Sequence, residues 1–365
     1  MSRFPDFSSN RVRWGLLPAL AAVVIAAVFF FTNRETQDPA LMTPRLAIEA
    51  VPAGSVYFNG PARPWLLTQR PELLTPEDRD TGSERSRSFA QAVQNPKLFR
   101  TLDRQNRFSS LLFVGDPSQY RPLLDHLLDT KDWRVAYLDH AGVIFRRGDE
   151  GGWNAAQVGG LASRFPQSRD QAIFLAQAAT KLVAVREPQA ARELLDRATA
   201  LDPKLPEAWN GLALLHMSRG EWRAALTQAE RALAIDDDFL PALASKAQIL
   251  FSVKKFSDAY EVSKRLVERQ PEDPGILFYH AKIAHEAHAY REEVKVLEKL
   301  IALAEKDSRP VTGYRIYLAQ AHAAAGDAKP SIEQFQLVLA DTEITPEQRT
   351  FASETLAQIK SRSGL

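Results

Sequence analysis

The chain has 365 residues, of which 45% are hydrophobic, and its formal net charge is +1 at pH 7. This size accommodates two modest folded bodies, and the nearly neutral charge argues against a general binder of polyanions such as nucleic acid. The absence of cysteine excludes disulfides, thiolate catalysis and cysteine-bound metals, and is compatible with an oxidising compartment.

The N-terminal region predicts a membrane anchor. Residues 15–31 form an uncharged apolar run that follows Trp14 and ends in three phenylalanines. With its flanking residues, the run is just long enough to cross a hydrocarbon core of about 30 Å. A cleaved signal sequence is the alternative, but its apolar part usually spans about 7–15 residues and ends at a small-x-small site. We therefore expect an uncleaved spanning helix at 15–32.

The charges around this run predict its orientation. Arg3, Arg11 and Arg13 precede it and are opposed by Asp6 alone. The positive-inside rule then keeps a tail of residues 1–14 in the cytoplasm. A polar tether at 33–43 follows, and the bulk of the chain lies outside. This predicts a single-pass protein of the bacterial inner membrane with a periplasmic body.

Residues 44–150 predict a small α/β domain, because short β-branched and aromatic runs alternate with helical stretches. The expected strands are 55–59, 109–114, 133–139 and 142–146, of which the last two form a hairpin. The expected helices are 89–104 and 117–128, with Asp116 capping the second one before Pro117. We expect some parallel pairing and an antiparallel edge. No Gly-rich phosphate-binding loop follows these strands.

Part of this segment reads YRPLLDHLLDTKDWRVAYLDHAGVIFRRG, with VYFNGPARPWLL nearer its start. It resembles the extracytoplasmic soluble domain of bacterial multi-spanning glycosyltransferases of the dolichyl-phosphate-mannose type. The resemblance implies a contact with a glycan or a lipid-linked sugar. It implies no glycosyl transfer, because that family's catalytic carboxylates lie on loops of a membrane domain that has no counterpart here.

From about residue 172 the chain repeats with a step of 34 residues. One column of small residues comprises Ala179, Ala213, Ala247 and Ala281. Parallel columns in the same register comprise Ala191, Ala225, Ala259 and Glu293; Ala198, Ala232, Leu266 and Leu300; and the aromatic residues Trp222, Phe256 and Tyr290. Each unit predicts two amphipathic helices whose backbones approach closely at the small residues.

The unit PEAWNGLALLHMSRGEWRAALTQAERALAIDDDF resembles the tetratricopeptide repeat (TPR) family, with the motif residues Trp209, Leu212, Gly220, Ala225 and Ala232. Ala213 and His216 stand where the family usually has Gly and Tyr. The resemblance implies a mainly α-helical, right-handed TPR-type solenoid over residues 154–365. Its expected units are 172–205, 206–239, 240–273, 274–307 and 312–345, followed by a capping helix at 346–362. Four extra residues are expected in the linker at 306–310.

A TPR solenoid offers a concave surface built from the first helix of each unit. The register places a predicted partner-binding groove on Asn210, Leu214, Met217, Ala244, Gln248, Phe251, Phe278, Lys282 and His285. Because neither the register nor the packing demands large apolar residues there, Phe251 and Phe278 are candidate anchors for a partner, unless neighbouring side chains cover both rings. The predicted function is a membrane-anchored scaffold for a protein or peptide partner, possessing no catalytic activity and requiring no cofactor.

Several other residues invite a chemical interpretation. Asp125 with His126, and Asp139 with His140, suggest proton transfer, but adjacent residues point in different directions and are better read as surface and turn residues. His280, His285 and His288 suggest a metal, but the spacing gives no third ligand on one face. His216 and His322 are read as packing residues. We therefore predict no catalytic and no metal site.

Two surfaces remain open. The basic stretch 84–107 fits a solvated helix face or a contact with anionic lipid. The alternative function is a non-catalytic accessory subunit of an envelope polysaccharide or glycosylation system, in which Trp65 and Trp153 would form an aromatic platform for a glycan.

Overall fold

The computed structural model describes residues 43–130, 132–148, 155–306, 309–342 and 344–363. They form two compact units, one ending at Ala242 and one beginning at Leu243. The predicted spanning helix at 15–32 and the boundary predicted at 150–154 fall outside the described residues. No helix in the described ranges has the length and apolar character needed to cross a membrane.

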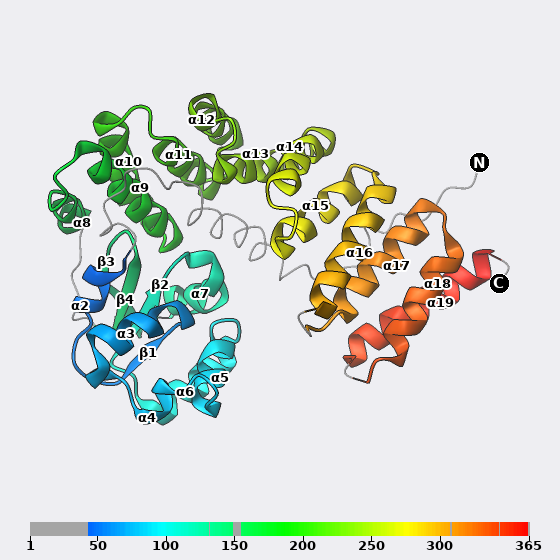
Figure 1. Cartoon of the computed structure of the whole chain (residues 1–365), viewed down its shortest axis with the longest axis horizontal. Coiled ribbons are helices and arrows are strands. Elements are labelled where there is room, and N and C mark those ends of the chain that lie inside the picture. Colours follow the sequence, from blue (N-terminus) through cyan, green and yellow to red (C-terminus); the bar gives the residue numbers. More distant parts are fainter. Residues whose placement is uncertain (1–42, 131, 149–154, 307–308, 343, 364–365) are drawn as a thin grey trace. The chain divides into compact units, whose positions relative to one another are not determined.

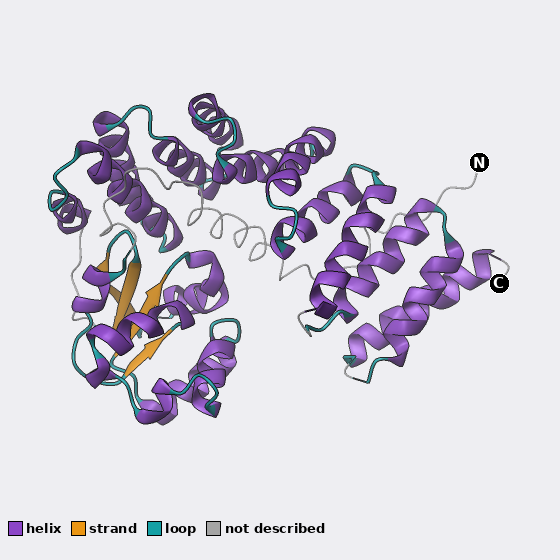
Figure 2. Cartoon of the chain, in the orientation of Figure 1, coloured by secondary structure: helices purple, strands orange, loops and turns teal. Residues whose placement is uncertain are grey.

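The first unit begins with a four-stranded sheet of β1 (Val56–Phe58), β2 (Ser110–Val114), β3 (Trp133–Leu138) and β4 (Gly142–Arg147), in the order β1-β2-β4-β3 (Figure 2). The strand predictions and the β3–β4 hairpin are confirmed. β1 and β2 pair in parallel, and β4 is antiparallel to both of its neighbours. Every residue of β1 and β2 is buried, as expected of short apolar strands covered on both faces.

The helices around this sheet are short (Figure 1). Their bounds are α2 (Arg45–Glu49), α3 (Arg63–Gln69), α4 (Pro76–Arg79), α5 (Glu84–Ala92), α6 (Pro96–Asn106) and α7 (Arg121–Asp129). The single helix predicted at 89–104 is wrong, because the chain forms α5 and α6 instead. The Asn95 side chain accepts hydrogen bonds from the backbone N–H groups of Lys97 and Leu98 and so starts a new helix at Pro96.

The predicted start of the next helix is also wrong. Residues Pro117–Tyr120 form a 3₁₀ turn, and α7 begins only at Arg121 with Tyr120 at the N-cap position. The Asp116 side chain therefore does not cap α7. A proline at the first helical position fits a 3₁₀ turn as well as an α-helix, so the sequence signal could not separate the two.

The rest of the chain is helical. It comprises α8 (Ala155–Ala162), which the sequence did not predict, and the pairs α9 (Ser168–Ala184) and α10 (Pro188–Leu201), α11 (Pro206–Ser218) and α12 (Trp222–Ile235), α13 (Leu240–Ser252) and α14 (Phe256–Arg269), α15 (Pro274–Glu286) and α16 (Tyr290–Lys306), and α17 (Thr312–Ala325) and α18 (Ala328–Ala340), followed by α19 (Pro346–Ser363).

The four extra residues predicted in the linker before the fifth repeat are placed differently in the structure. α16 has 17 residues, whereas α12 and α14 have 14 each. Most of the extra length is thus a continuation of α16 through Ala304–Lys306 rather than added linker. Ala304 is buried in the second unit, and this burial stabilises the additional turn.

The columns of the repeat fill the contacts between helices. Ala179, Ala213 and Ala247 are fully buried, and Ala281 is 2% exposed. In the column that begins at Ala191, Ala225 and Ala259 are also fully buried. Glu293 stands at the corresponding position of the fourth repeat. Small residues at these positions let neighbouring helix backbones pack closely, as the sequence predicted.

We expect Ala247→Leu to lower the free energy of unfolding by about 1–3 kcal/mol, because the added atoms have no space in a fully buried contact. Thermal unfolding of the purified full chain, followed by circular dichroism, measures the effect. Ala357→Leu on exposed α19 is the matched control and should leave the melting temperature unchanged. An unchanged melting temperature for Ala247→Leu would show that the repeat register is misassigned.

The sheet and the first helix pairs share one core. A single cluster of buried side chains extends from Ala47 of α2 to Leu215 of α11. At its centre, Lys181 of α9 is 7% exposed and donates a hydrogen bond of 2.5 Å from Nζ to the backbone oxygen of His140, in the β3–β4 turn. Burial lowers the pKa of Lys181, and Asp116 and Asp139 partly offset this effect. The sheet and α9 are therefore fixed to each other.

Candidate partner-binding surface

In the first compact unit, which ends at Ala242, the predicted groove residues are on α11. Asn210 is 1% exposed, and its Oδ1 atom accepts no hydrogen bond from the described residues. Leu214 and Met217 are half-buried. Of these three residues, only Leu214 and Met217 have surface available to a partner. Asn210 contributes only a buried polar atom to this part of the helix.

Nearby, the motif residue Trp209 stabilises the same helix pair. Its Nε1 atom donates a hydrogen bond of 2.9 Å to the backbone oxygen of Pro203, and the guanidinium of Arg231 lies 5.0 Å from the ring centroid. His216, predicted to be a packing residue, is half-buried and hydrogen bonds through Nδ1 to Glu221. This bond lowers the pKa of the Glu221 carboxyl.

In the second unit, Phe251 of α13 is half-buried. Its ring centroid lies 5.4 Å from that of Phe256 and 6.3 Å from that of Tyr279, and the Lys282 Nζ atom lies 6.0 Å from the Phe251 centroid. Lys282 is half-buried, and this burial lowers its pKa. Gln248, one turn before Phe251, is also half-buried. These residues form a partly open aromatic surface beside an amino group.

Phe278 is placed differently from Phe251. It is 6% exposed, and its ring contacts those of Tyr314 and Tyr317 of α17, with centroids 5.7 and 5.1 Å away. It belongs to a core cluster with Leu297, Leu300 and Leu318. Neighbouring side chains thus cover this ring, which is the alternative that the sequence left open, whereas Phe251 remains partly accessible.

His285 of α15 hydrogen bonds through Nδ1 to Oε2 of Glu293 on α16, at 3.0 Å. The bond raises the pKa of His285. Burial raises the pKa of the Glu293 carboxyl, which is 3% exposed, and the bond from His285 offsets part of that rise. The pair joins the two helices of its unit, and His285 keeps an exposed edge.

His280 and His288 each have a separate hydrogen-bond partner. His280 is buried, accepts or donates a hydrogen bond of 2.7 Å with Ser263 Oγ, and has its pKa lowered to about 4 by burial. His288 bonds to the hydroxyl of Tyr290 at 2.6 Å, and His322 is 9% exposed. Within the described ranges, no group of three His, Cys, Asp or Glu side chains is placed to hold a metal.

The two Asp-His pairs do not form proton-transfer dyads. Asp125 binds Arg121 and Arg186 at 2.9 and 3.1 Å. Asp139 accepts hydrogen bonds of 2.8 Å from the backbone N–H groups of Ala141 and Gly142 and one of 3.0 Å from the hydroxyl of Tyr137, while His140 Nδ1 lies 4.0 Å away. Asp139 thus shapes the β3–β4 turn.

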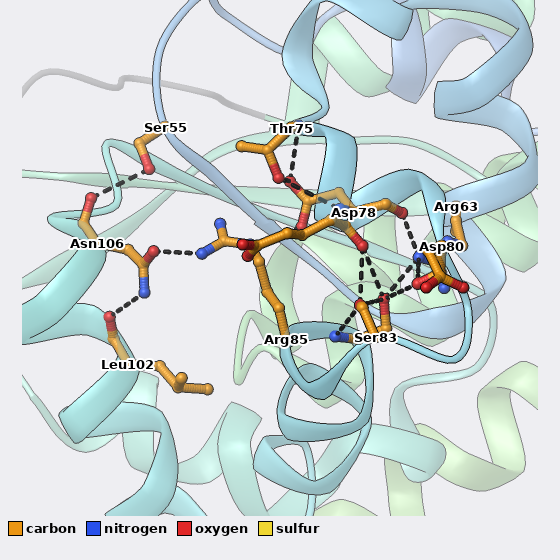
Figure 3. Close-up of polar contacts among 11 residues, drawn as sticks. Ser55, Arg63, Thr75, Asp78, Asp80, Ser83, Arg85, Leu102 and Asn106 are labelled. Atoms are coloured by element: carbon orange, nitrogen blue, oxygen red, sulfur yellow. Dashed lines mark hydrogen bonds and ion pairs between the residues drawn. The ribbon is translucent and has the colours of Figure 1, made fainter.

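A buried polar cluster around Asp78, shown in Figure 3, was missed by the sequence analysis. Asp78 is 2% exposed; Oδ1 accepts from Arg85 Nε at 2.7 Å, and Oδ2 accepts from the backbone and hydroxyl of Thr75 at 2.9 and 2.8 Å. Arg85 also binds Asn106 at the end of α6. The capping-box spacing from Thr75 to Asp78 was a usable signal for this contact.

A pocket of about 190 Å³ opens beside the cluster and is lined by Arg63, Asp78, Ser86 and Arg87 among others. The Arg63 Nη2 atom already donates to the Asp80 backbone oxygen at 2.9 Å and to Ser86 Oγ at 2.6 Å. The cluster therefore uses its charges to hold the segment between α3 and α5 in place. Arg63 Nε is the buried polar atom of this lining that has no hydrogen-bond partner among the described residues.

Comparisons with known proteins match the helix pairs. The family model described as the tetratricopeptide repeat matches residues 182–250. A TPR repeat-containing protein of Rhizobium etli is 30% identical over 100 residues, which are 27% of this chain. The match spans about half, 49%, of that relative's length. The match to the tetratricopeptide repeat is thus shown for residues 182–250. These comparisons give no support to the resemblance of residues 44–150 to glycosyltransferase domains.

Solved structures match this chain at low identity and with low TM-scores. MamA of Desulfovibrio magneticus RS-1 is 17% identical, covers 47% of this chain and 94% of its own, and has a TM-score of 0.40. YrrB, described as a TPR protein with an unusual peptide-binding site, is 16% identical over 49% of this chain and 90% of its own, with a TM-score of 0.41. PilF of Pseudomonas aeruginosa is 15% identical over 53% and 91%, with a TM-score of 0.40.

Proposed function

We propose that this protein is a scaffold that binds a protein or peptide partner through the first helices of its TPR-type repeats. The observation that supports the proposal is the partly open Phe251, with Tyr279 and Lys282 at its edge. A large aromatic ring left partly exposed beside a cation is typical of a protein-binding surface, where aromatic anchors contribute most of the affinity.

The proposed contact is an apolar surface for one side chain of the partner. Phe251 and Phe256 offer the apolar faces. The Tyr279 hydroxyl, which is buried and accepts no bond from the described residues, and the Lys282 amino group offer donors to a backbone carbonyl or carboxylate of the partner. Leu214 and Met217 on α11 are proposed as a separate apolar contact of the first unit.

Phe251→Ala is expected to reduce partner capture tenfold or more, because an aromatic anchor typically contributes about 2 kcal/mol or more. Crosslinked pull-down of the tagged full chain from native membranes, with quantitative mass spectrometry of the captured proteins, measures this. Leu337→Ala, at a 48% exposed position on α18, is the control for loss of a surface apolar residue and should capture normally.

Both variants must keep the circular dichroism spectrum and melting temperature of the original chain. If Phe251→Ala folds normally and still captures every partner, the inner faces of these helices are not the binding surface, and the α/β sheet region becomes the candidate. The accessory glycan-binding role gains no supporting observation, because Trp65 packs half-buried against the core and Trp153 is outside the described residues.

We also propose that residues 15–31 anchor the scaffold in the inner membrane with its body in the periplasm. The length of the apolar run and the arginines ahead of it support this. A reporter that is active only in the periplasm, fused after Leu365, is expected to be active. A silent periplasmic reporter together with an active cytoplasmic one would reverse the topology, and a product beginning near residue 33 would show cleavage instead of anchoring.

A further inference from the structure

The outer face of α6 carries a row of basic side chains. Lys97, Arg100 and Arg104 are spaced by three and four residues, so they lie along one side of the helix, and Arg107 follows at its C-cap position in the left-handed conformation. All four are exposed. At about 1.5 Å per residue, the three helical positions span roughly 10 Å. We call these four residues the α6 basic row.

The α6 basic row has no neutralising partner among the described residues. Asp103 is the acidic residue of α6, and it binds Arg147 on β4 at 2.5 Å. The only side-chain bond within the row runs from Arg104 Nε to the backbone oxygen of Arg100, at 3.4 Å. Four cations thus remain without a described carboxylate partner.

The predicted basic stretch 84–107 is therefore divided by the fold. Arg85 turns toward Asp78, and Arg87 donates to the backbone oxygen of Gly82, so both act within the protein. The four residues of the α6 basic row point to solvent. The chain as a whole carries a net charge of +1, which makes this row a local and not a general source of positive potential.

The orientation of the row is fixed by the opposite face of α6. Phe99 is 1% exposed and Leu102 is 9% exposed, and both pack in the core of the first unit. The charge of Arg100 also acts on His126 of α7. Burial is the largest cause that lowers the pKa of His126, and the positive charge of Arg100 is the second. In Figure 1, α5 and α6 lie at the end of this unit away from α8 to α10.

We propose that the α6 basic row rests on the anionic headgroups of a lipid membrane. Four exposed cations, three along one side of α6 and one at its C-terminal end, complement a flat, negatively charged surface. The tether supports this choice of partner. Residues 33–43 extend by at most about 3.3–3.6 Å each, so the anchor proposed above keeps the folded body within roughly 40 Å of the membrane surface.

Headgroup contact makes the row part of the anchoring, because the lipid attachment would hold the sheet-bearing unit against the membrane. Each Lys or Arg near an anionic surface strengthens binding severalfold, and salt screens the effect. The contact should therefore depend on anionic lipid and weaken at high ionic strength.

The chain has no cysteine, so a single introduced cysteine gives a unique labelling site. Thr101→Cys places a fluorophore on the exposed side of α6, and Thr227→Cys on exposed α12 serves as the control. The full chain is added to vesicles of phosphatidylcholine alone or with phosphatidylglycerol, each containing a lipid with a quencher on its headgroup. The comparison of the two lipids is valid whether or not residues 15–31 span the bilayer.

We expect the label at residue 101 to be quenched at least twofold more in the vesicles that contain phosphatidylglycerol, and high salt to remove the difference. The label at residue 227 should show no difference. Equal quenching of the residue 101 label in both lipids would overturn the proposal, as would a difference that survives high salt.

Charge removal tests the row itself. The combined variant K97Q/R100Q/R104Q/R107Q keeps good helix formers and should abolish the lipid-dependent difference. The matched control K255Q/K264Q/K299Q/K329Q removes four exposed charges from the second unit and should retain it. Loss in both variants would assign the effect to net charge and would refute the α6 contact. Both variants are checked for an unchanged melting temperature.

Discussion

Phe278→Ala is expected to lower the free energy of unfolding by about 3–5 kcal/mol, because it removes a 6% exposed ring from the contact between α15 and α17 and leaves a cavity beside Tyr314 and Tyr317. Urea unfolding of the full chain, with hydrogen exchange resolved to α15 and α17, measures the loss. The effect should appear first in these two helices.

Leu337→Ala is the matched control in the same unit, since that side chain is 48% exposed and should contribute less than about 0.5 kcal/mol. A Phe278→Ala variant of unchanged stability that fails to capture partners would return Phe278 to the binding surface. Phe251→Ala should instead lose partner capture and keep its stability. This contrast would distinguish a core residue on α15 from a partner-binding residue on α13.

Asp78→Ala is expected to destabilise the first unit by about 3–5 kcal/mol, because it leaves the partly buried Arg85 without its carboxylate and also removes the capping bonds to Thr75. Denaturant unfolding of the full chain, with hydrogen exchange of α4 to α6, reports the change. Arg85 lies 4.7 Å from the ring of Phe89, so the loss should spread into the aromatic core around Tyr57.

Glu77→Ala is the control, since the neighbouring carboxylate is exposed and forms no described side-chain bond. Asp78→Asn should be intermediate, because an amide keeps an acceptor but loses the charge that pairs with Arg85. If Asp78→Ala and Glu77→Ala unfold at the same denaturant concentration, the cluster does not stabilise the fold. Its residues would then become candidates for a role at the pocket that they line.

The repeats were predictable from sequence because their information is local. Each helix carries its own apolar period, and the alanine column at 34-residue spacing predicted the buried contacts at Ala213 and Ala247. The four strands were predictable because short apolar runs between turn residues have few alternatives. The break at Asn95 was missed because the helical period continues across it, although the Asn-Pro pair signals a new N-terminus.

The candidate surfaces depend on contacts that the sequence does not specify. The sequence predicted Phe251 and Phe278 alike for the inner face, yet α17 covers only the second ring. Likewise, Arg85 and Arg100 belong to one basic stretch, and only the fold sends the first to Asp78 and the second to solvent.

The sequence by itself determined the helix pairs of the repeats, their register and the strands, because each follows from the periodicity of neighbouring residues. Only the tertiary structure decided which side chains are accessible, and that the sheet and α9 share a core through Lys181 and His140. Those contacts join residues far apart in the chain. Their formation depends on the packing of whole elements, which no local pattern encodes.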